Sequence, residues 1–259
     1  MGIGLDLGST TTKGVLVDQS GKVIAAHLIP TGAIASKAAE NVLKELTMLS
    51  QLDLDDVTTV STGYGRTQVK FAHESITEIT CHSVGVHNLN PRIKLLIDVG
   101  GQDSKVIRIG SKGRPTDFEL NDKCSAGTGR FLEVMARVLE VSIDELGPLA
   151  LKSKSPCPIS STCTVFAESE VIGRIGSGES PANIAAGVHQ SMAAKISTLS
   201  RRVGVVTPIG VTGGVARNPA FRHYLSVTLN SDLWMPEEPQ LTGALGAAIL
   251  AIAKASDTE

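Results

Sequence analysis

Apolar and polar positions follow the same order in two blocks of the chain, residues 3–17 (IGLDLGSTTTKGVLV) and 95–109 (LLIDVGGQDSKVIRI). Each block is an apolar segment, a turn with Asp-x-Gly and small polar residues, and a second apolar segment after a lysine. This is the pattern of a β-hairpin with a polar tip. A shift of 92 positions aligns Asp6 with Asp98, Gly8 with Gly100 and Lys13 with Lys105. Two such hairpins predict two similar domains.

Outside the hairpins the chain alternates between helical and strand patterns. Apolar residues recur at helical spacing in 33–50, and a β-branched segment at 57–61 precedes a glycine turn at 62–65. The further elements expected are helices at 131–139, 184–203 and 243–253, and a strand at 208–211 that ends in the glycine turn 212–214. This alternation predicts an α/β fold.

Composition excludes several classes of protein. Lys and Arg total 24 against 26 Asp and Glu, so no strong field would attract nucleic acid or an anionic membrane surface. Five Phe, two Tyr and one Trp are too few for platforms that stack single-stranded bases. The longest nearly apolar run, 241–253, is shorter than the stretch of about 20 residues that crosses a bilayer. Asp6 and Lys13 would interrupt a secretory signal, so we expect a cytoplasmic protein.

The two hairpin tips carry the chemistry of a phosphate site. Glycine lets backbone N–H groups approach an anion, hydroxyls add donors, and Lys13 supplies positive charge. Asp6 and Asp98, one at each strand end, are suited to holding hydrated Mg²⁺. Glycine and aspartate are also common in ordinary turns, so it is the repetition that favours phosphate binding. The chain has no Walker A motif, and the opening GIGLDLG lacks the third glycine of a dinucleotide fingerprint.

The strings DLGSTTTK (6–13), DVGGQDSK (98–105) and VTGGVARN (211–218) resemble the two phosphate motifs and the adenosine motif of the actin-like ATPase fold. Sugar kinases and heat-shock chaperones share this fold. The resemblance implies two βββαβα-type lobes around an ATP and Mg²⁺ cleft, with a last helix (LTGALGAAIL) that returns to the first lobe. The implied lobes are residues 1–91 with 241–259, and residues 92–240.

The same resemblance implies a set of nucleotide contacts. The expected phosphate contacts are Ser9, Thr10, Thr11, Thr12, Lys13, Gly100, Gly101 and Gln102. The expected contacts at the nucleoside end are Gly213, Gly214, Ala216, Asn218 and Gln240. Asp6 and Asp98 are expected to hold Mg²⁺ through water. Either Gln102 or Asp103 is expected to orient the attacking water.

A narrower resemblance is carried by NDKCSAGTGRFLE (121–133) and SSTCTVFAESE (160–170), together with TGYGR and GGQDSK. These strings resemble the activator ATPases of 2-hydroxyacyl-CoA dehydratases, the BadF/BadG/BcrA/BcrD group. The resemblance implies that Cys124 and Cys163 bind a 4Fe-4S cluster, one per homodimer, so that two chains supply four ligands. It further implies a one-electron donor driven by ATP, reloaded by ferredoxin or flavodoxin. The acceptor would be an iron–sulfur dehydratase or, alternatively, a benzoyl-CoA reductase or a double-cubane cluster protein.

Taken without the resemblance, the cysteines leave alternatives open. No CxxC spacing occurs, and free cysteine often fills a core. Cys124 and Cys163 each precede an apparent helix, whose N-terminal dipole would stabilise a thiolate. We leave Cys81 and Cys157 out of the cluster, although a four-cysteine cluster within one chain would need both. Three further candidates have ordinary interpretations: His82 as a hydrogen-bonded packing residue, and Glu168 and Glu170 as helix charges.

Two other functions would use the same nucleotide motifs. A small-molecule kinase of this fold would transfer phosphate to a sugar-type substrate, but it would leave Cys124 and Cys163 without a role. A nucleotide-switched chaperone would need a peptide-binding extension, for which the chain is short. The activator therefore remains the favoured interpretation.

Overall fold

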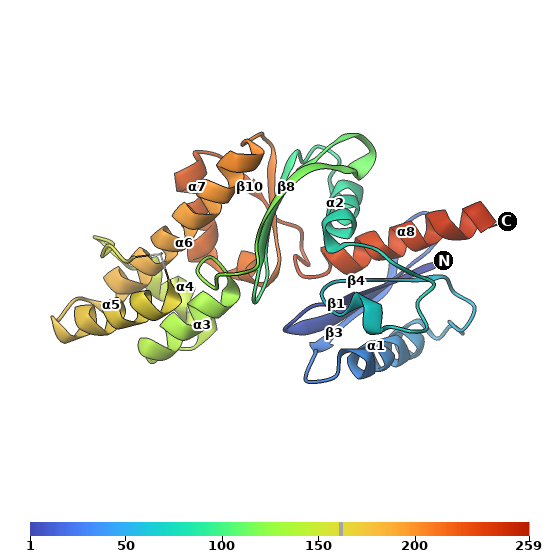
Figure 1. Ribbon diagram of the computed structural model, residues 1–259, viewed down its shortest axis with the longest axis horizontal. Coiled ribbons are helices and arrows are strands. Elements are labelled where there is room, and N and C mark those ends of the chain that lie inside the picture. The colour runs from blue at the N-terminus through green and yellow to red at the C-terminus, as the bar shows by residue number, and fades with distance from the viewer. Residues whose placement is uncertain (161–162, 259) are drawn as a thin grey trace. The chain divides into compact units, whose positions relative to one another are not determined.

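The computed structural model describes residues 1–160 and 163–258, and it divides into two compact units (Figure 1). Unit 1 comprises Met1–Ile93, Ile109–Thr116 and the chain from Pro236 onward, and unit 2 comprises Lys94–Arg108 and Asp117–Met235. Each unit contains a five-stranded sheet with helices, which confirms the α/β class. Every helix of the described residues is too short or too polar to cross a bilayer.

The sheet of unit 1 has the strand order β3-β2-β1-β4-β5. Its central strand β1 (Gly2–Leu7) pairs antiparallel with β2 (Thr11–Val17) and parallel with β4 (Thr59–Thr62). The outer strands are β3 (Val23–Pro30) and β5 (Glu74–Ser75); the helices are α1 (Ala35–Ser50), α2 (Glu78–Leu89) and α8 (Thr242–Thr258); the short 3-10 turns are η1 (Arg66–Gln68) and η2 (Ser111–Gly113).

The two faces of β1 explain its GIGLDL sequence. Ile3, Leu5 and Leu7 point to one face, where they join a hydrophobic cluster with α1. On the other face, a Cβ at Gly2 or Gly4 would overlap carbonyl oxygens of α8, so only glycine lets this helix lie directly on the strand. Figure 1 shows α1 and α8 on opposite sides of this sheet. The opening glycines therefore serve helix packing.

The sheet of unit 2 has the order β10-β9-β6-β7-β8. The strands are β6 (Leu95–Val99), β7 (Ser104–Ile109), β8 (Pro115–Asn121), β9 (Ile209–Thr212) and β10 (Leu233–Trp234). The helices are α3 (Gly129–Val138), α4 (Ile143–Ala150), α5 (Thr164–Gly176), α6 (Pro181–Val203) and α7 (Pro219–Leu229), with a 3-10 turn η3 (Gly214–Arg217). The expected helices at 131–139 and 184–203 coincide with α3 and α6, whose apolar faces share one core with β6 and β9.

The two predicted hairpins have the same register, which confirms that the repeat in the sequence is a repeat in structure. In each, the aspartate of the first strand lies opposite the lysine of the second and beside a threonine of a parallel strand. These groups are Asp6, Lys13 and Thr62 in unit 1, and Asp98, Lys105 and Thr212 in unit 2.

Candidate nucleotide and thiol sites

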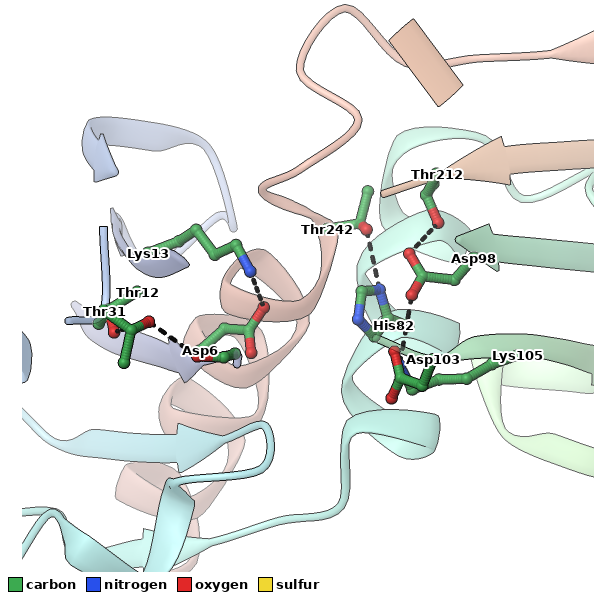
Figure 2. Close-up of polar contacts among 11 residues, drawn as sticks. Asp6, Thr12, Lys13, Thr31, His82, Asp98, Asp103, Lys105, Thr212 and Thr242 are labelled. Atoms are coloured by element: carbon green, nitrogen blue, oxygen red, sulfur yellow. Dashed lines mark hydrogen bonds and ion pairs between the residues drawn. The ribbon is translucent and has the colours of Figure 1, made fainter. Parts of the chain in front are cut away.

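The tip of unit 1 is organised around an ion pair between Asp6 and Lys13. The Lys13 Nζ atom lies 3.2 Å from Asp6 Oδ2, and both side chains are largely buried (Figure 2). The tip is closed by the Gly8 N–H, which donates to the Thr11 carbonyl at 3.1 Å. Ser9 and Thr10 are exposed at the turn and so are available to a phosphate. The expected anion contacts of this unit thus lie together at the end of one hairpin.

Thr12 differs from its hydroxyl-bearing neighbours. Its Oγ1 is 3.0 Å from Thr31 Oγ1, and the Thr31 hydroxyl donates to the Gly8 carbonyl at 2.7 Å. Thr12 is completely buried. Thr12 therefore stabilises the turn from its buried side, while Thr11 remains partly exposed at the tip.

The tip of unit 2 has the same aspartate and lysine with more partners. Asp98 Oδ1 accepts a hydrogen bond from the Thr212 hydroxyl at 2.8 Å, and Asp98 Oδ2 lies 3.5 Å from Lys105 Nζ (Figure 2). Lys105 also pairs with Asp103 at 2.9 Å. Gln102 is exposed, whereas the Asp103 carboxylate is held by this lysine, so the two candidates for orienting water have different surroundings.

Helix α3 is joined directly to this second tip. The carbonyl of Gly100 accepts from the Gly129 N–H at 2.8 Å, and the carbonyl of Gly101 accepts from the Arg130 N–H at 2.8 Å. These are N–H groups of the first helical turn, which have no partner inside their own helix. The Ser104 hydroxyl also donates to the Gly127 carbonyl. A shift of the tip would therefore move the turn before α3.

The expected nucleoside contacts divide between the two units. Gly213 follows β9 with a φ of +86°, where a side chain would clash with the Val99 backbone, so glycine is required beside the Asp98 strand. Gly214 and Ala216 lie in η3. Asn218 caps α7, since its Oδ1 accepts from the backbone N–H groups of residues 220 and 221. Gln240 lies in unit 1, shortly before α8.

The segments that carry Cys124 and Cys163 meet in unit 2. A hydrogen bond of 2.6 Å joins the hydroxyls of Ser125 and Thr164, the residues that follow the two cysteines. Both thiols are free and partly exposed. Cys163 is the N-cap of α5, as expected, whereas a turn separates Cys124 from α3. The Asn121 side chain holds that turn by donating to the Cys124 carbonyl at 2.8 Å.

The other two cysteines have different surroundings. Cys81 is completely buried in unit 1, and burial raises the pKa of its thiol to about 12, which disfavours the thiolate that binds metal. Cys157 is buried in the core of unit 2. Within residues 1–160 and 163–258, no three His, Cys, Asp or Glu side chains form a metal-binding group. This arrangement does not favour the alternative of a four-cysteine cluster within one chain.

Several residues of these sites were not singled out in the sequence. Thr62 and Thr212 each end a strand before a glycine turn, so the repeated Thr-Gly pair was a usable signal. Thr242 was also not singled out: it lies 160 positions from His82, and its hydrogen bond with that histidine agrees with the interpretation of His82 as a hydrogen-bonded packing residue.

Comparisons with known proteins agree with this geometry. The family model described as "BadF/BadG/BcrA/BcrD ATPase family" matches residues 3–251. The activator of lactoyl-CoA dehydratase from Anaerotignum propionicum is 44% identical over 250 residues, covering 96% of each chain.

Two solved structures share almost the whole chain. The ADPNP-bound activator of the 2-hydroxyisocaproyl-CoA dehydratase from Clostridium difficile is 42% identical with a TM-score of 0.92, covering 99% of this chain and 96% of that one. Component A of the Acidaminococcus fermentans (R)-2-hydroxyglutaryl-CoA dehydratase is 40% identical with a TM-score of 0.94, covering 98% of both. The expected actin-like ATPase fold is confirmed. The chain belongs to the BadF/BadG/BcrA/BcrD ATPase family and is an ATPase.

Proposed function

We propose that the chain is an activator that couples ATP hydrolysis to the transfer of one electron to an iron–sulfur enzyme. The acceptor best supported is a 2-hydroxyacyl-CoA dehydratase, since relatives that match nearly the full length are named as activators of such enzymes. A benzoyl-CoA reductase is an alternative acceptor, because a subunit of that enzyme is 32% identical over 221 residues; a double-cubane cluster protein is another. Ferredoxin or flavodoxin would reload the donor.

The observation that carries this proposal is the contact between the segments that carry Cys124 and Cys163. Two partly exposed thiols whose following residues are hydrogen-bonded fit one edge of a 4Fe-4S cluster, which takes four thiolates. A second copy of the chain would supply the other two, so the protein would be a homodimer. When bound, the cluster would supply the electron. The first N–H groups of α5, which begins directly after Cys163, would stabilise the thiolate and the anionic cluster.

The surface beside Cys163 carries exposed apolar side chains that a second protein chain could cover. Val165 and Phe166, in the first turn of α5, are 65% and 68% exposed. Large apolar side chains at such exposure, next to a site that lacks half of its ligands, favour contact with another protein. A second copy that completes the cluster would have to approach this turn.

The proposed phosphate contacts are Ser9, Thr10, Thr11 and Lys13 in unit 1 and Gly100 to Gln102 in unit 2, whereas the buried Thr12 would support the tip through its bond to Thr31. Mg²⁺ typically takes one or two carboxylates and keeps several waters. The Asp98 carboxylate already accepts a hydrogen bond from Thr212 and pairs with Lys105, so it would bind Mg²⁺ through a water molecule. Among the described residues, the one ion pair of Asp6 is with Lys13. Asp6 would therefore be the principal carboxylate for Mg²⁺.

The hydrogen bonds of α3 provide a physical connection from nucleotide to thiol. The tip at Gly100 and Gly101 is bonded to the first turn of α3, and the turn that carries Cys124 ends at that helix. Loss of the γ-phosphate would displace the tip and, through these bonds, the Cys124 turn. Raising the electron by roughly 200 mV requires about 4 to 5 kcal/mol, at about 1.4 kcal/mol per 59 mV for one electron.

Anaerobic purification tests the proposal. We expect a brown dimer with about four iron atoms per two chains, since each chain would supply two of four ligands. Cys124→Ala and Cys163→Ala should each lose the iron and keep ADP binding, while Cys157→Ala should keep the iron. A colourless protein that phosphorylates a sugar would favour the kinase instead. Full iron content in both ligand variants would refute the cluster assignment.

A further inference from the structure

Asn121, the last residue of β8, holds the turn that carries Cys124. Its Nδ2 atom donates to two carbonyls of that turn, those of Cys124 at 2.8 Å and Ala126 at 3.1 Å. Both partners are acceptors, so the amide nitrogen, and not the amide oxygen, must face the turn. Asn121 is only 9% exposed. The two carbonyls are therefore directed into unit 2 by one buried side chain.

The peptide group between Cys124 and Ser125 is thereby fixed in direction. It is trans, and in a trans peptide group the N–H points opposite to the carbonyl. Because the Cys124 carbonyl faces Asn121, the Ser125 N–H points away from that buried side chain. This N–H has no acceptor within residues 1–160 and 163–258. Within the described chain it is an unused donor, directly after a proposed cluster ligand.

Ser125 lies where the segments of both proposed ligands meet. Its hydroxyl is 2.6 Å from the hydroxyl of Thr164, the residue after Cys163. Cys124 and Cys163 are both partly exposed. A group bound to both thiols would therefore lie beside the Ser125 backbone.

The helix after Cys124 does not offer the donors that α5 would offer at Cys163. The N–H groups of residues 129 and 130, in the first turn of α3, are already bonded to the carbonyls of residues 100 and 101. Hydrogen bonds to the sulfur atoms are one of the means by which a protein sets the reduction potential of an iron–sulfur cluster. At Cys124, such a donor has to come from the turn itself.

We propose that Asn121 is a positioning residue of the proposed cluster site, and that it directs the Ser125 N–H to the Cys124 sulfur as a hydrogen-bond donor. The inference rests on the proposed cluster. A donor at a ligand sulfur stabilises the reduced, more negative state of a cluster more than the oxidised state. Asn121 would therefore make the cluster easier to reduce without touching it. Each chain of the proposed homodimer would contribute one such donor.

The midpoint potential of the cluster, measured by anaerobic redox titration followed by EPR, tests this role. Asn121→Leu keeps the approximate shape and the neutral charge but has no donor. Loss of one donor per chain, at about threefold each, should lower the ratio of reduced to oxidised cluster at a given potential about tenfold, which is a midpoint about 59 mV more negative. Asn121→Ser can keep one of the two bonds and should shift the midpoint less.

Thr128→Val is the matched control, because it loosens the same turn without releasing the Cys124 carbonyl. It removes the hydroxyl that donates to the Ser125 carbonyl at 2.7 Å, whereas the N–H of residue 128 still donates to that carbonyl at 3.0 Å. Valine keeps the approximate shape of this buried threonine. The cluster of Thr128→Val should have the wild-type midpoint potential.

The outcomes separate this inference from the proposed function. An unchanged midpoint potential in the Asn121 variants would overturn the inference, and so would an equal shift in Thr128→Val, because loosening of the turn would then explain it. Should Asn121→Leu fail to fold or to keep its iron, Asn121→Ser decides. Iron lost from both Asn121 variants and kept by Thr128→Val would support the role. A wild-type protein without iron would refute the cluster itself, and the inference with it.

Discussion

The Ser125 and Thr164 hydroxyls lie 2.6 Å apart, although the two residues are 39 positions apart in the chain. One follows Cys124 in the turn before α3, and the other opens α5 directly after Cys163. Because each neighbours a cysteine, this bond links the backbone segments that carry the two thiols. In the cluster proposed above, the bond would preorganise the thiol pair.

Removal of this bond should weaken the cluster more visibly than the fold. Ser125→Ala deletes a hydrogen bond that contributes about 1 kcal/mol, so we expect the melting temperature to fall by only about 2 to 4 °C. The same energy lost from the thiol pair corresponds to iron release to a chelator about fivefold faster. Release rates under anaerobic conditions measure this directly.

Ser169→Ala is a suitable control for that experiment. Ser169 is exposed on α5, and its hydroxyl only donates to the Val165 carbonyl one turn earlier. Its iron should be released at the wild-type rate. Equal rates for Ser125→Ala and wild type would mean that the hydroxyl pair does not position the thiols.

Lys13→Met should impair ATP turnover and leave the iron in place. The substitution removes the charge beside Asp6 while keeping most of the side-chain volume. Loss of one preorganised electrostatic group typically lowers kcat by about 10² to 10³-fold. Lys22→Met, at an exposed position of the same unit, should keep full activity. Wild-type ATPase activity in Lys13→Met would contradict the placement of the phosphates.

The repeated hairpins could be predicted because their signal is local. The aspartate, glycine and lysine of each tip stand within eight residues, and the strand register places Asp6 opposite Lys13 as the alternation implied. The apolar helix at the end of the chain was also recognisable, and it packs in unit 1 as α8. In both cases one face of the element is buried, and the regular spacing of apolar residues reveals such a face.

Other features depend on contacts between distant segments and left no local signal. Strand β8 is mostly exposed, and its short alternation of Phe118 and Leu120 with polar residues was not singled out as a strand. The hairpin patterns did not extend to the third strands, β3 and β8, which were expected only from the βββαβα lobes that the family resemblance implies. Cys124 and Cys163 were paired by family resemblance, whereas the bond between Ser125 and Thr164 is visible only in the fold. His82 was interpreted as a hydrogen-bonded residue, and its partner Thr242 lies 160 positions away.

Gly4→Ala should be among the most destabilising substitutions of unit 1. A methyl group there would overlap the Ala244 carbonyl of α8, and backbone on both sides leaves little room to adjust. Overpacking of this kind costs about 1 to 3 kcal/mol, occasionally more. Denaturant unfolding measures the change.

Gly173→Ala provides the opposite expectation for the same chemical change. Gly173 is inside α5, and a Cβ there would meet nothing within 4 Å. Alanine in a helix interior should therefore stabilise the protein by about 0.4 to 1 kcal/mol. If both alanine variants changed stability equally, the close contact between β1 and α8 would be refuted.

Stability should fall between pH 6.5 and pH 4 because of His189, a completely buried residue of α6. Burial lowers its pKa from 6.5 to about 4, and the hydrogen bond with the Ala185 carbonyl and the neighbouring Asn218 side chain oppose this only in part. As the pH falls, the unfolded chain therefore binds a proton at a higher pH than the folded chain does. The contribution of His189 to the free energy of unfolding is complete above pH 6.5, declines between pH 6.5 and pH 4, and does not change further below pH 4. Between pH 7 and pH 5 the free energy of unfolding should fall by about 2 kcal/mol.

His189→Leu should remove that part of the pH dependence, measured as the difference in unfolding free energy between the two pH values, whereas His223→Leu should keep it. The same decline in His189→Leu as in the wild type would show that other groups cause it.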